Sequence, residues 1–202
     1  MLPGPIRTFE CPNCKSLTYK RSIASGNTIG AKLYSDGKRI APMLPIFPII
    51  TKCQKCNNIY WLENENQRLN VNLPENIKEA NFLSTDEYLS VIGTDVIRNK
   101  ADEKYIRREI WWTFNDNIRD QENPRENLAS NSEYCENAKS LIGLLDENIQ
   151  DFIMKAELYR NIGEFWESIV CLNQIESNDL DFIIDSVLKM SIIGHTNTFR
   201  LY

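Results

Sequence analysis

Apolar residues recur at helical spacing through the C-terminal two thirds of the chain. In the clearest stripe an isoleucine or phenylalanine returns every fourth residue, which predicts an amphipathic helix over about 102–119. The stripe consists of Ile106, Ile110, Phe114 and Ile118. Shorter patterns predict further helices over 85–92, 132–145 and 179–193. The C-terminal part is therefore expected to be an all-α helical bundle.

Short β-prone runs fill the first 62 residues instead. Asp36-Gly37 is a strong hairpin turn, and the segments on either side of it, 28–34 and 38–41, would be its strands. The apolar and aromatic run over 59–62 predicts another strand. Together with the helical pattern, these runs predict an α+β protein in which a small β domain precedes the helices.

Charge divides the chain at the same place. Residues 1–62 hold nine Lys or Arg and two acidic residues, a charge of +7, whereas residues 63–202 carry a charge of −12. We expect a β domain over 1–62, a linker over 63–81 that is rich in Asn and Glu, and an α-helical domain over 82–202. An apolar alternation at 69–73 is compatible with one short strand inside the linker.

Composition is that of an ordinary folded protein, with 42% hydrophobic and 25% charged residues. The net charge of −5 argues against nucleic-acid binding over the whole surface. His195 is the single histidine, which excludes any site that needs two imidazoles. Three prolines interrupt the most apolar segment, 40–50, so that it cannot span a membrane as a helix. With no recognisable export signal, we expect a cytoplasmic protein without a membrane partner.

Four of the six cysteines form two CxxC pairs with 38 residues between them. The pairs are Cys11 with Cys14 and Cys53 with Cys56. Two residues between the cysteines let one tight turn aim both sulfurs at one point, and two such turns supply the four thiolates of a tetrahedral Zn²⁺ site. In a reducing compartment, paired cysteines bind metal more often than they form disulfides. We therefore expect one structural Zn²⁺ ion per chain.

Both CxxC turns resemble the knuckles of zinc-ribbon proteins, in which a CPxC first knuckle is frequent. The resemblance implies a small β ribbon held by the metal. The chain departs from the commonest pattern at Lys15 and Asn57, where a glycine often follows the second cysteine, and Asn tolerates positive φ better than Lys. A redox dithiol and a catalytic zinc are the alternatives. Neither CxxC clearly opens a helix after a strand, and four cysteines leave no open coordination position.

One segment of the long predicted helix is the best candidate for a further site. Asn115 and Arg119 lie four residues apart on one helix face, and Asp116 and Arg119 lie three apart. Next to Trp111 and Trp112, these polar side chains could recognise a ligand or a partner. The alternative is that both indoles fill the core while the polar cluster ties the helix to a loop.

The stretch over 148–177 resembles one tetratricopeptide repeat. Small residues stand at Ala156 and Ser168, where paired helices approach closely, and Gly163 stands at the turn between them. The resemblance implies a helical hairpin, and a peptide-binding groove on it is one hypothesis. Because a solenoid needs about three repeats, the single match favours a bundle with one repeat-like hairpin. The two CxxC motifs, the runs over 26–28, 34–38 and 41–45, and the segment over 111–119 together resemble bacterial proteins that join a zinc ribbon to a helical, tetratricopeptide-like half, which implies an architecture but no activity.

Basic residues of the N-terminal part are a candidate nucleic-acid surface. Lys20, Arg21, Lys38 and Arg39 are interleaved with tyrosines, as in proteins that bind single strands or RNA. The alternative is a solvated basic face that complements the acidic helical half.

Prolines at every third position, Pro42, Pro45 and Pro48, have the period of polyproline II. This segment could be a docking ligand. We expect instead that its apolar residues are buried against the helical half, because exposure would create an aggregation-prone patch. These residues are Met43, Leu44, Ile46 and Phe47.

These observations predict a zinc-binding, non-enzymatic module that binds a protein or peptide partner through the helical hairpin or the ribbon face. Nucleic-acid binding by the basic ribbon is the alternative. An enzyme would need a pocket of convergent polar groups, for which the cluster of Asn115, Asp116 and Arg119 is the candidate. No spacing in the sequence singles out an acid and a base.

Overall fold

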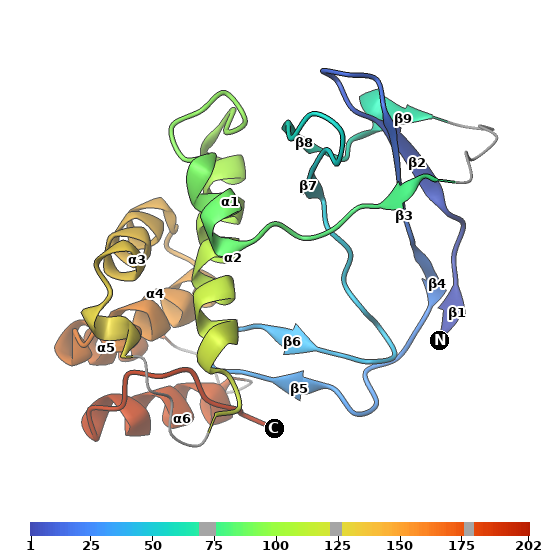
Figure 1. The fold of residues 1–202 in the computed structure, drawn as a ribbon. Helices are drawn as coiled ribbons and strands as arrows, with labels where there is room; N and C mark the ends of the chain where they lie inside the picture. Colours follow the sequence, from blue (N-terminus) through green and yellow to red (C-terminus); the bar gives the residue numbers. More distant parts are fainter. Residues whose placement is uncertain (69–75, 122–126, 176–179) are drawn as a thin grey trace. The chain divides into compact units, whose positions relative to one another are not determined.

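The computed structural model describes residues 1–68, 76–121, 127–175 and 180–202 (Figure 1). Short β-strands occupy the N-terminal region and helices occupy the C-terminal half. This arrangement confirms the α+β prediction. None of the described helices is long and apolar enough to cross a membrane.

Two compact units make up the chain, and each is assembled from two segments. The first, called here the ribbon unit, consists of residues 1–31 and 40–97. The second, called here the helical unit, consists of residues 32–39 and 98–202. The chain therefore passes from one unit to the other three times.

This division differs from the predicted boundaries at two places. Residues 32–39 belong to the helical unit although they precede the second knuckle, and residues 82–97 belong to the ribbon unit. Hydrogen bonds from the helical segment to the side chain of Asp36 account for the first difference. Described residues of the predicted linker 63–81 form elements of the ribbon unit, and the alternation at 69–73 lies outside the described residues.

A four-stranded sheet is the centre of the ribbon unit. β2 (Arg7–Glu10) and β3 (Leu17–Lys20) pair antiparallel, and the first knuckle lies in the connection between them. β9 (Gln67–Arg68) pairs with β2, and β10 (Lys78–Glu79) runs parallel to β3. The strand order is β10-β3-β2-β9.

A separate antiparallel hairpin carries the second knuckle. It consists of β7 (Ile50–Lys52) and β8 (Ile59–Trp61), with Thr51 opposite Tyr60. The strand predicted at 59–62 is thereby confirmed. Each knuckle is thus the connection of an antiparallel strand pair, which fixes the direction in which the chain enters and leaves it.

The remaining elements of the ribbon unit are short. They are β1 (Leu2–Pro3), which pairs with β4 (Ile23–Ser25), the 3-10 turn η1 (Asn64–Asn66) and α1 (Thr85–Ser90). α1 starts with a capping box in which the side chains of Ser84 and Glu87 each accept a hydrogen bond from the other residue's backbone amide. The helix ends earlier than the predicted range of 85–92.

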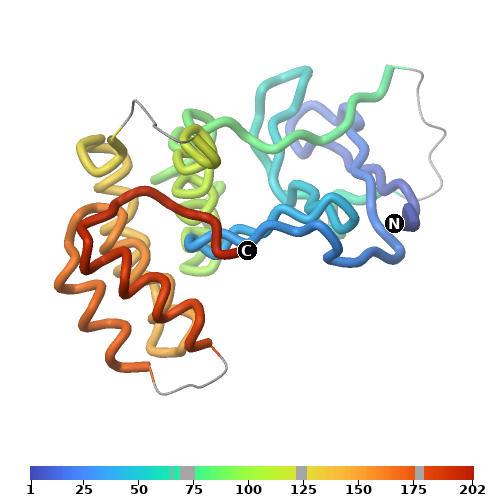
Figure 2. Tube along the Cα trace, turned by 90° about the horizontal axis from the view of Figure 1, so that it is seen from below, coloured from blue at the N-terminus to red at the C-terminus, as the bar shows by residue number. Residues whose placement is uncertain are grey.

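Helices and one β-hairpin form the helical unit (Figure 2). The helices are α2 (Lys100–Ile118), α3 (Ser132–Leu144), α4 (Ile149–Asn161), α5 (Phe165–Leu172) and α6 (Asp181–Ile192), with the 3-10 turn η2 (Leu128–Ser130) before α3. α2 packs on α3, α3 packs on α4, and α4, α5 and α6 contact one another. The hairpin strands are β5 (Lys32–Leu33) and β6 (Arg39–Ile40), which are shorter than predicted and join at the Asp36-Gly37 turn.

The helices of the structure lie close to where the apolar pattern predicts them. The four residues of the predicted stripe on α2 are all buried, and α2 and α3 match their predicted ranges within two residues. α6 lies inside the range predicted at 179–193, of which residue 179 is outside the described residues. α4 and α5 form the expected helical hairpin, with Gly163 at φ 85° in its turn. Its likeness to a tetratricopeptide repeat stays a prediction.

Candidate metal centre

Both knuckles have the same backbone geometry. In the first, the Cys11 amide donates to the Ser16 carbonyl at 2.9 Å, and the Lys15 amide donates to the Cys11 carbonyl at 3.0 Å. In the second, the Cys53 amide donates to the Asn58 carbonyl at 2.8 Å, and the Asn57 amide donates to the Cys53 carbonyl at 2.9 Å. This repetition presents the two cysteines of each turn on the same side.

Lys15 and Asn57 occupy the equivalent position of the two turns, and each has φ 61°. This is the left-handed region that favours glycine, which explains why glycine is common there in knuckles. Asn adopts it more readily than Lys does. Both turns therefore form without the glycine of the common pattern, and the backbone is more strained at Lys15 than at Asn57.

All four sulfurs of the two knuckles lie together. Their Sγ atoms are within 4.8 Å of one another, with Cys11 and Cys56 at 3.7 Å and Cys14 and Cys53 at 3.6 Å. None of the four cysteines is in a disulfide. A tetrahedron of sulfurs at ~2.3 Å from a central ion has edges of ~3.8 Å, so the observed separations suit a tetrahedral metal ion. The structure thus brings together every residue expected to bind metal.

The surroundings of the sulfurs are mostly apolar. Cys11 and Cys53 are buried, whereas Cys14 and Cys56 are partly exposed. They pack with Phe9, Tyr60, Leu62 and Ala80 in the core of the ribbon unit. Burial raises the pKa of the Cys11 thiol. Burial also opposes ionisation of Cys53, but hydrogen bonds from the Ser16 hydroxyl and from backbone amides outweigh it and lower the pKa of that thiol.

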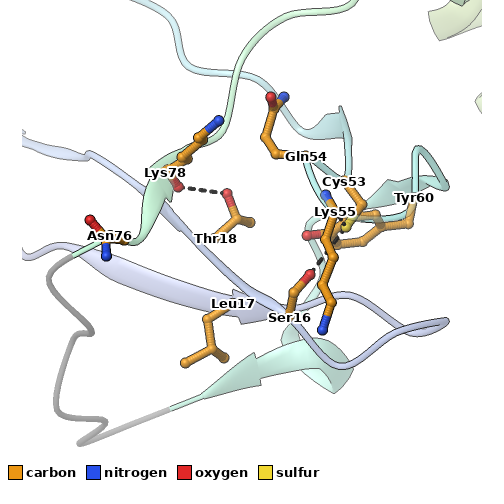
Figure 3. A pocket seen from close by; sticks show the side chains of 9 residues that line it. All are labelled: Ser16, Leu17, Thr18, Cys53, Gln54, Lys55, Tyr60, Asn76 and Lys78. Atoms are coloured by element: carbon orange, nitrogen blue, oxygen red, sulfur yellow. Dashed lines mark hydrogen bonds between the residues drawn. The ribbon is translucent and has the colours of Figure 1, made fainter.

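A small cavity of about 210 Å³ adjoins the sulfur group (Figure 3). Ser16, Cys53, Lys55 and Tyr60 contribute to its wall. The Ser16 hydroxyl lies at the sulfur end, 3.1 Å from the Sγ atom of Cys53 and 3.1 Å from that of Cys14. Ser16 was not singled out from the sequence, since a serine two residues after a cysteine is an unremarkable signal.

The second candidate site, on α2, lies in the helical unit and faces the hairpin turn. The Asp36 carboxylate accepts a hydrogen bond from Asn115 Nδ2 at 2.9 Å and from Arg119 Nη1 and Nη2 at 3.2 and 2.7 Å. Trp112 Nε1 donates to the Asp36 carbonyl at 3.0 Å. Arg119 Nε also donates to Asp116, which forms an ion pair with Lys38. These side chains therefore hold the chain's own hairpin.

Trp111 lies in the core of the helical unit, next to this polar cluster. It is completely buried, and its Nε1 atom donates to the Tyr134 hydroxyl at 3.1 Å and to Asn161 Oδ1 at 3.0 Å. The Tyr134 hydroxyl in turn donates to Asn115 Oδ1 at 3.0 Å. The alternative for this segment is that both indoles fill the core while the polar cluster ties the helix to a loop. The contacts of Trp111 and of the polar cluster agree with it, whereas Trp112 is only half-buried.

A buried ion pair on α4 extends this network, and the sequence did not single it out. The guanidinium of Arg160 and the carboxylate of Glu157 are both fully buried and hydrogen bonded to each other. Ser35 Oγ of the hairpin donates to Glu157 Oε1 at 2.6 Å, and the Phe199 amide donates to Ser35 Oγ at 3.1 Å. The spacing of three residues between Glu157 and Arg160 is too common on helix surfaces to have indicated a buried pair.

The four nucleic-acid candidates are divided between the two units. Lys20 and Arg21 belong to the ribbon unit, where Lys20 lies over the Phe9 ring and Arg21 pairs with Glu79 at 2.6 Å. Lys38 and Arg39 belong to the helical unit. The ribbon unit contains eight basic and eight acidic residues, so the excess charge of residues 1–62 is not a property of the unit that carries the sulfurs.

An apolar cavity of about 620 Å³ lies on the ribbon unit, beside the segment with three prolines. Its wall includes Met1, Ile6, Ile46, Phe47 and Phe82. Ile46 is 61% exposed and Phe82 is 48% exposed. The expectation that the apolar residues between the prolines are buried is wrong for Ile46 and for Met43, which is 37% exposed. Ile46 and Phe47 line an open groove with the N-terminal strand.

In comparisons with protein-family models, curated proteins and solved structures, the chain matches none of them.

Proposed function

We propose that the protein binds one structural Zn²⁺ ion through Cys11, Cys14, Cys53 and Cys56. The convergence of four Sγ atoms within 4.8 Å carries this proposal. Zinc is favoured over other divalent ions because thiolates are soft ligands and a set of four sulfurs is tetrahedral. Four protein ligands leave no position for a substrate, so the ion would stabilise the ribbon unit and would not act in catalysis.

Metal analysis of the purified chain tests the zinc site. We expect one zinc per chain, and replacement by Co²⁺ should give the intense visible bands of tetrahedral cobalt with thiolate-to-cobalt charge transfer in the near ultraviolet. A chain that contains no metal and does not bind Co²⁺ after reduction would overturn the proposal. Iron in place of zinc would keep the site and change its ion.

We further propose that the protein acts as a non-enzymatic interaction module for a protein or peptide with an apolar segment. The apolar groove of the ribbon unit supports this role, because exposed residues such as Ile46 and Phe82 line it. The α4–α5 hairpin offers a second surface, on which Trp166 is 71% exposed. The polar residues of α2 that are candidates for an enzyme bind the chain's own hairpin, where Asn115 and Arg119 contact Asp36. Asp116 pairs there with Lys38.

Two matched substitutions distinguish these surfaces. Phe82→Glu and Trp166→Glu each replace an exposed aromatic side chain, so neither is expected to unfold its unit. Affinity capture from native lysate should retain a protein with the wild-type chain and lose it with one variant only. The affinity of that purified protein for each variant, measured separately, then identifies the surface, because only the variant altered at that surface should bind weakly. Equal capture by the wild-type chain and both variants would contradict a role for either surface.

Nucleic-acid binding is the less well supported alternative. The ribbon unit has equal numbers of basic and acidic residues, and Arg21 and Lys38 form ion pairs within their own units. Nucleic acid detected in the same eluates, with binding that falls steeply as salt is added, would favour this alternative.

A further inference from the structure

We propose that Ser16 is a positioning residue of the metal centre, whose hydroxyl joins the two knuckles and slows the exchange of the ion. This inference rests on the proposed zinc site. It assigns a role to a side chain that is not itself a ligand.

The Ser16 hydroxyl bridges sulfurs that belong to different knuckles. Its oxygen is 3.1 Å from Cys14 Sγ and 3.1 Å from Cys53 Sγ, and these two sulfurs are 3.6 Å apart. The hydroxyl therefore covers one edge of the sulfur tetrahedron. Ser16 also accepts the Cys11 amide at its carbonyl oxygen, so a single residue contacts three of the four cysteines.

The equivalent residue of the second knuckle lacks this feature. Asn58 stands in the same place relative to Cys53, and its carbonyl oxygen accepts the Cys53 amide at 2.8 Å. Among the hydrogen bonds of the described residues, none joins the Asn58 side chain to a sulfur. The two knuckles therefore share their backbone bonds and differ in the hydroxyl, which makes Asn58 a matched control.

The chemistry of a thiolate site explains why one hydroxyl matters. Four thiolates around a divalent ion carry excess negative charge, and release of the ion begins when a competing ligand binds the ion and displaces a thiolate. A hydrogen bond donated to sulfur withdraws electron density, which relieves part of this excess charge, and it also fixes the position of the sulfur. Ser16 and Cys53 both line the adjoining cavity, so water and competing ligands inside it meet the hydroxyl next to the Cys53 sulfur (Figure 3).

Zinc transfer to a chromogenic chelator tests the proposal with Ser16→Ala, Ser16→Thr and Asn58→Ala. From the zinc-loaded chain, Ser16→Ala should release the ion about 10-fold faster or more, as for other residues that support metal ligands. Ser16→Thr keeps a hydroxyl and should stay near the wild-type rate, as should Asn58→Ala. Complete loss of zinc from Ser16→Ala, with zinc retained by the two other variants, would support the proposal more strongly than faster release.

The Co²⁺-loaded chains give a readout that loosened packing would not change. Without the hydrogen bond the sulfur is a better donor, so the thiolate-to-cobalt charge-transfer band of Ser16→Ala should move to lower energy. The bands of tetrahedral cobalt should persist. A wild-type release rate and band position in Ser16→Ala would overturn the proposal, as would equal acceleration in Asn58→Ala. Failure of the wild-type chain to bind Zn²⁺ or Co²⁺ would instead overturn the zinc site itself.

Discussion

Asp36 and Arg119 form an ion pair that is almost completely withdrawn from solvent. The side chain of Asp36 is 0% exposed and that of Arg119 is 4% exposed, and the contact is bidentate. Arg119 also lies over the Tyr34 ring at 4.3 Å. Since a buried charge depends on its partner, loss of either side chain should be costly while the pair itself need not be strongly stabilising.

Replacing Asp36 by Asn should therefore destabilise the helical unit by about 3 kcal/mol, because the buried Arg119 guanidinium loses its buried counter-charge and keeps only the partly exposed Asp116. Urea denaturation followed by far-UV circular dichroism measures the change. Asp120→Asn is the control, since it removes an ion pair with Lys32 that is exposed and should cost much less. Equal losses in the two variants would contradict the buried pairing.

Glu109 predicts a dependence of stability on pH. This carboxyl group is 7% exposed, and burial raises its pKa above the ordinary 4.5 despite the neighbouring Arg108. A group whose pKa is raised on folding stabilises the fold at low pH and loses that contribution as pH rises through the folded value. Glu109→Gln should therefore raise the urea midpoint near pH 7, with a smaller difference near pH 4.5. A gain that does not change with pH would argue against burial as the cause.

At the scale of elements, the knuckles and the hairpin turns follow from local chemistry. The CxxC spacing and the Asp36-Gly37 turn are short-range signals, and the structure has both turns where they were predicted. The helical stripe of α2 is equally local, since its period is set by the helix itself. Such signals predicted the metal ligands and most helices.

The strained position of the first knuckle gives a prediction at this scale. Lys15→Gly should stabilise the zinc-loaded chain by about 1 kcal/mol, because glycine adopts positive φ without the steric cost. Asn57→Gly should gain less, since Asn already tolerates this conformation. Thermal unfolding of the zinc-loaded variants compares the two. A larger gain at Asn57 would contradict the assignment of strain to Lys15.

Two glycines of the helical unit should respond to alanine with opposite signs. Gly163 has φ 85° in the α4–α5 turn with open space around it, so Gly163→Ala should cost about 1 kcal/mol from backbone strain alone. Gly143 lies inside α3, also with open space, so Gly143→Ala should stabilise by about 0.5–1 kcal/mol. Chemical denaturation measures both, and a gain at Gly163 would show that its turn is not left-handed.

For the whole molecule, the proposed zinc site and the helices should be separable in their response to metal loss. Cys53→Ser removes one of four ligands and should abolish zinc binding, which supplies about 10–16 kcal/mol in comparable small sites. The ribbon unit should unfold while most far-UV helicity survives. Cys135→Ser, in α3 and outside the sulfur group, is the control and should keep its zinc. Complete loss of helicity in Cys53→Ser would contradict this separation.

The division into units could not be predicted from the sequence, because it depends on contacts between distant residues. The partners of Asp36 on α2 lie about 80 positions later in the chain, and Glu157, which binds Ser35, lies 122 positions after it. The prediction from charge placed the hairpin in the β domain, because it used the net charge of all of the first 62 residues. Nothing in the turn itself indicates that a carboxylate on it is bound by a buried arginine from another part of the chain.

The inclusion of residues 32–39 in the helical unit has a consequence for folding during synthesis on the ribosome. The ribbon unit is complete once residue 97 has emerged, so it can fold and take up its metal early. At that moment the hairpin has none of its helical partners. Asp36 stays in water until α2 is made, and Ser35 waits for Glu157 and then for Phe199, which follow it by 122 and 164 positions. The hairpin is thus synthesised long before the residues that hold it in its final place.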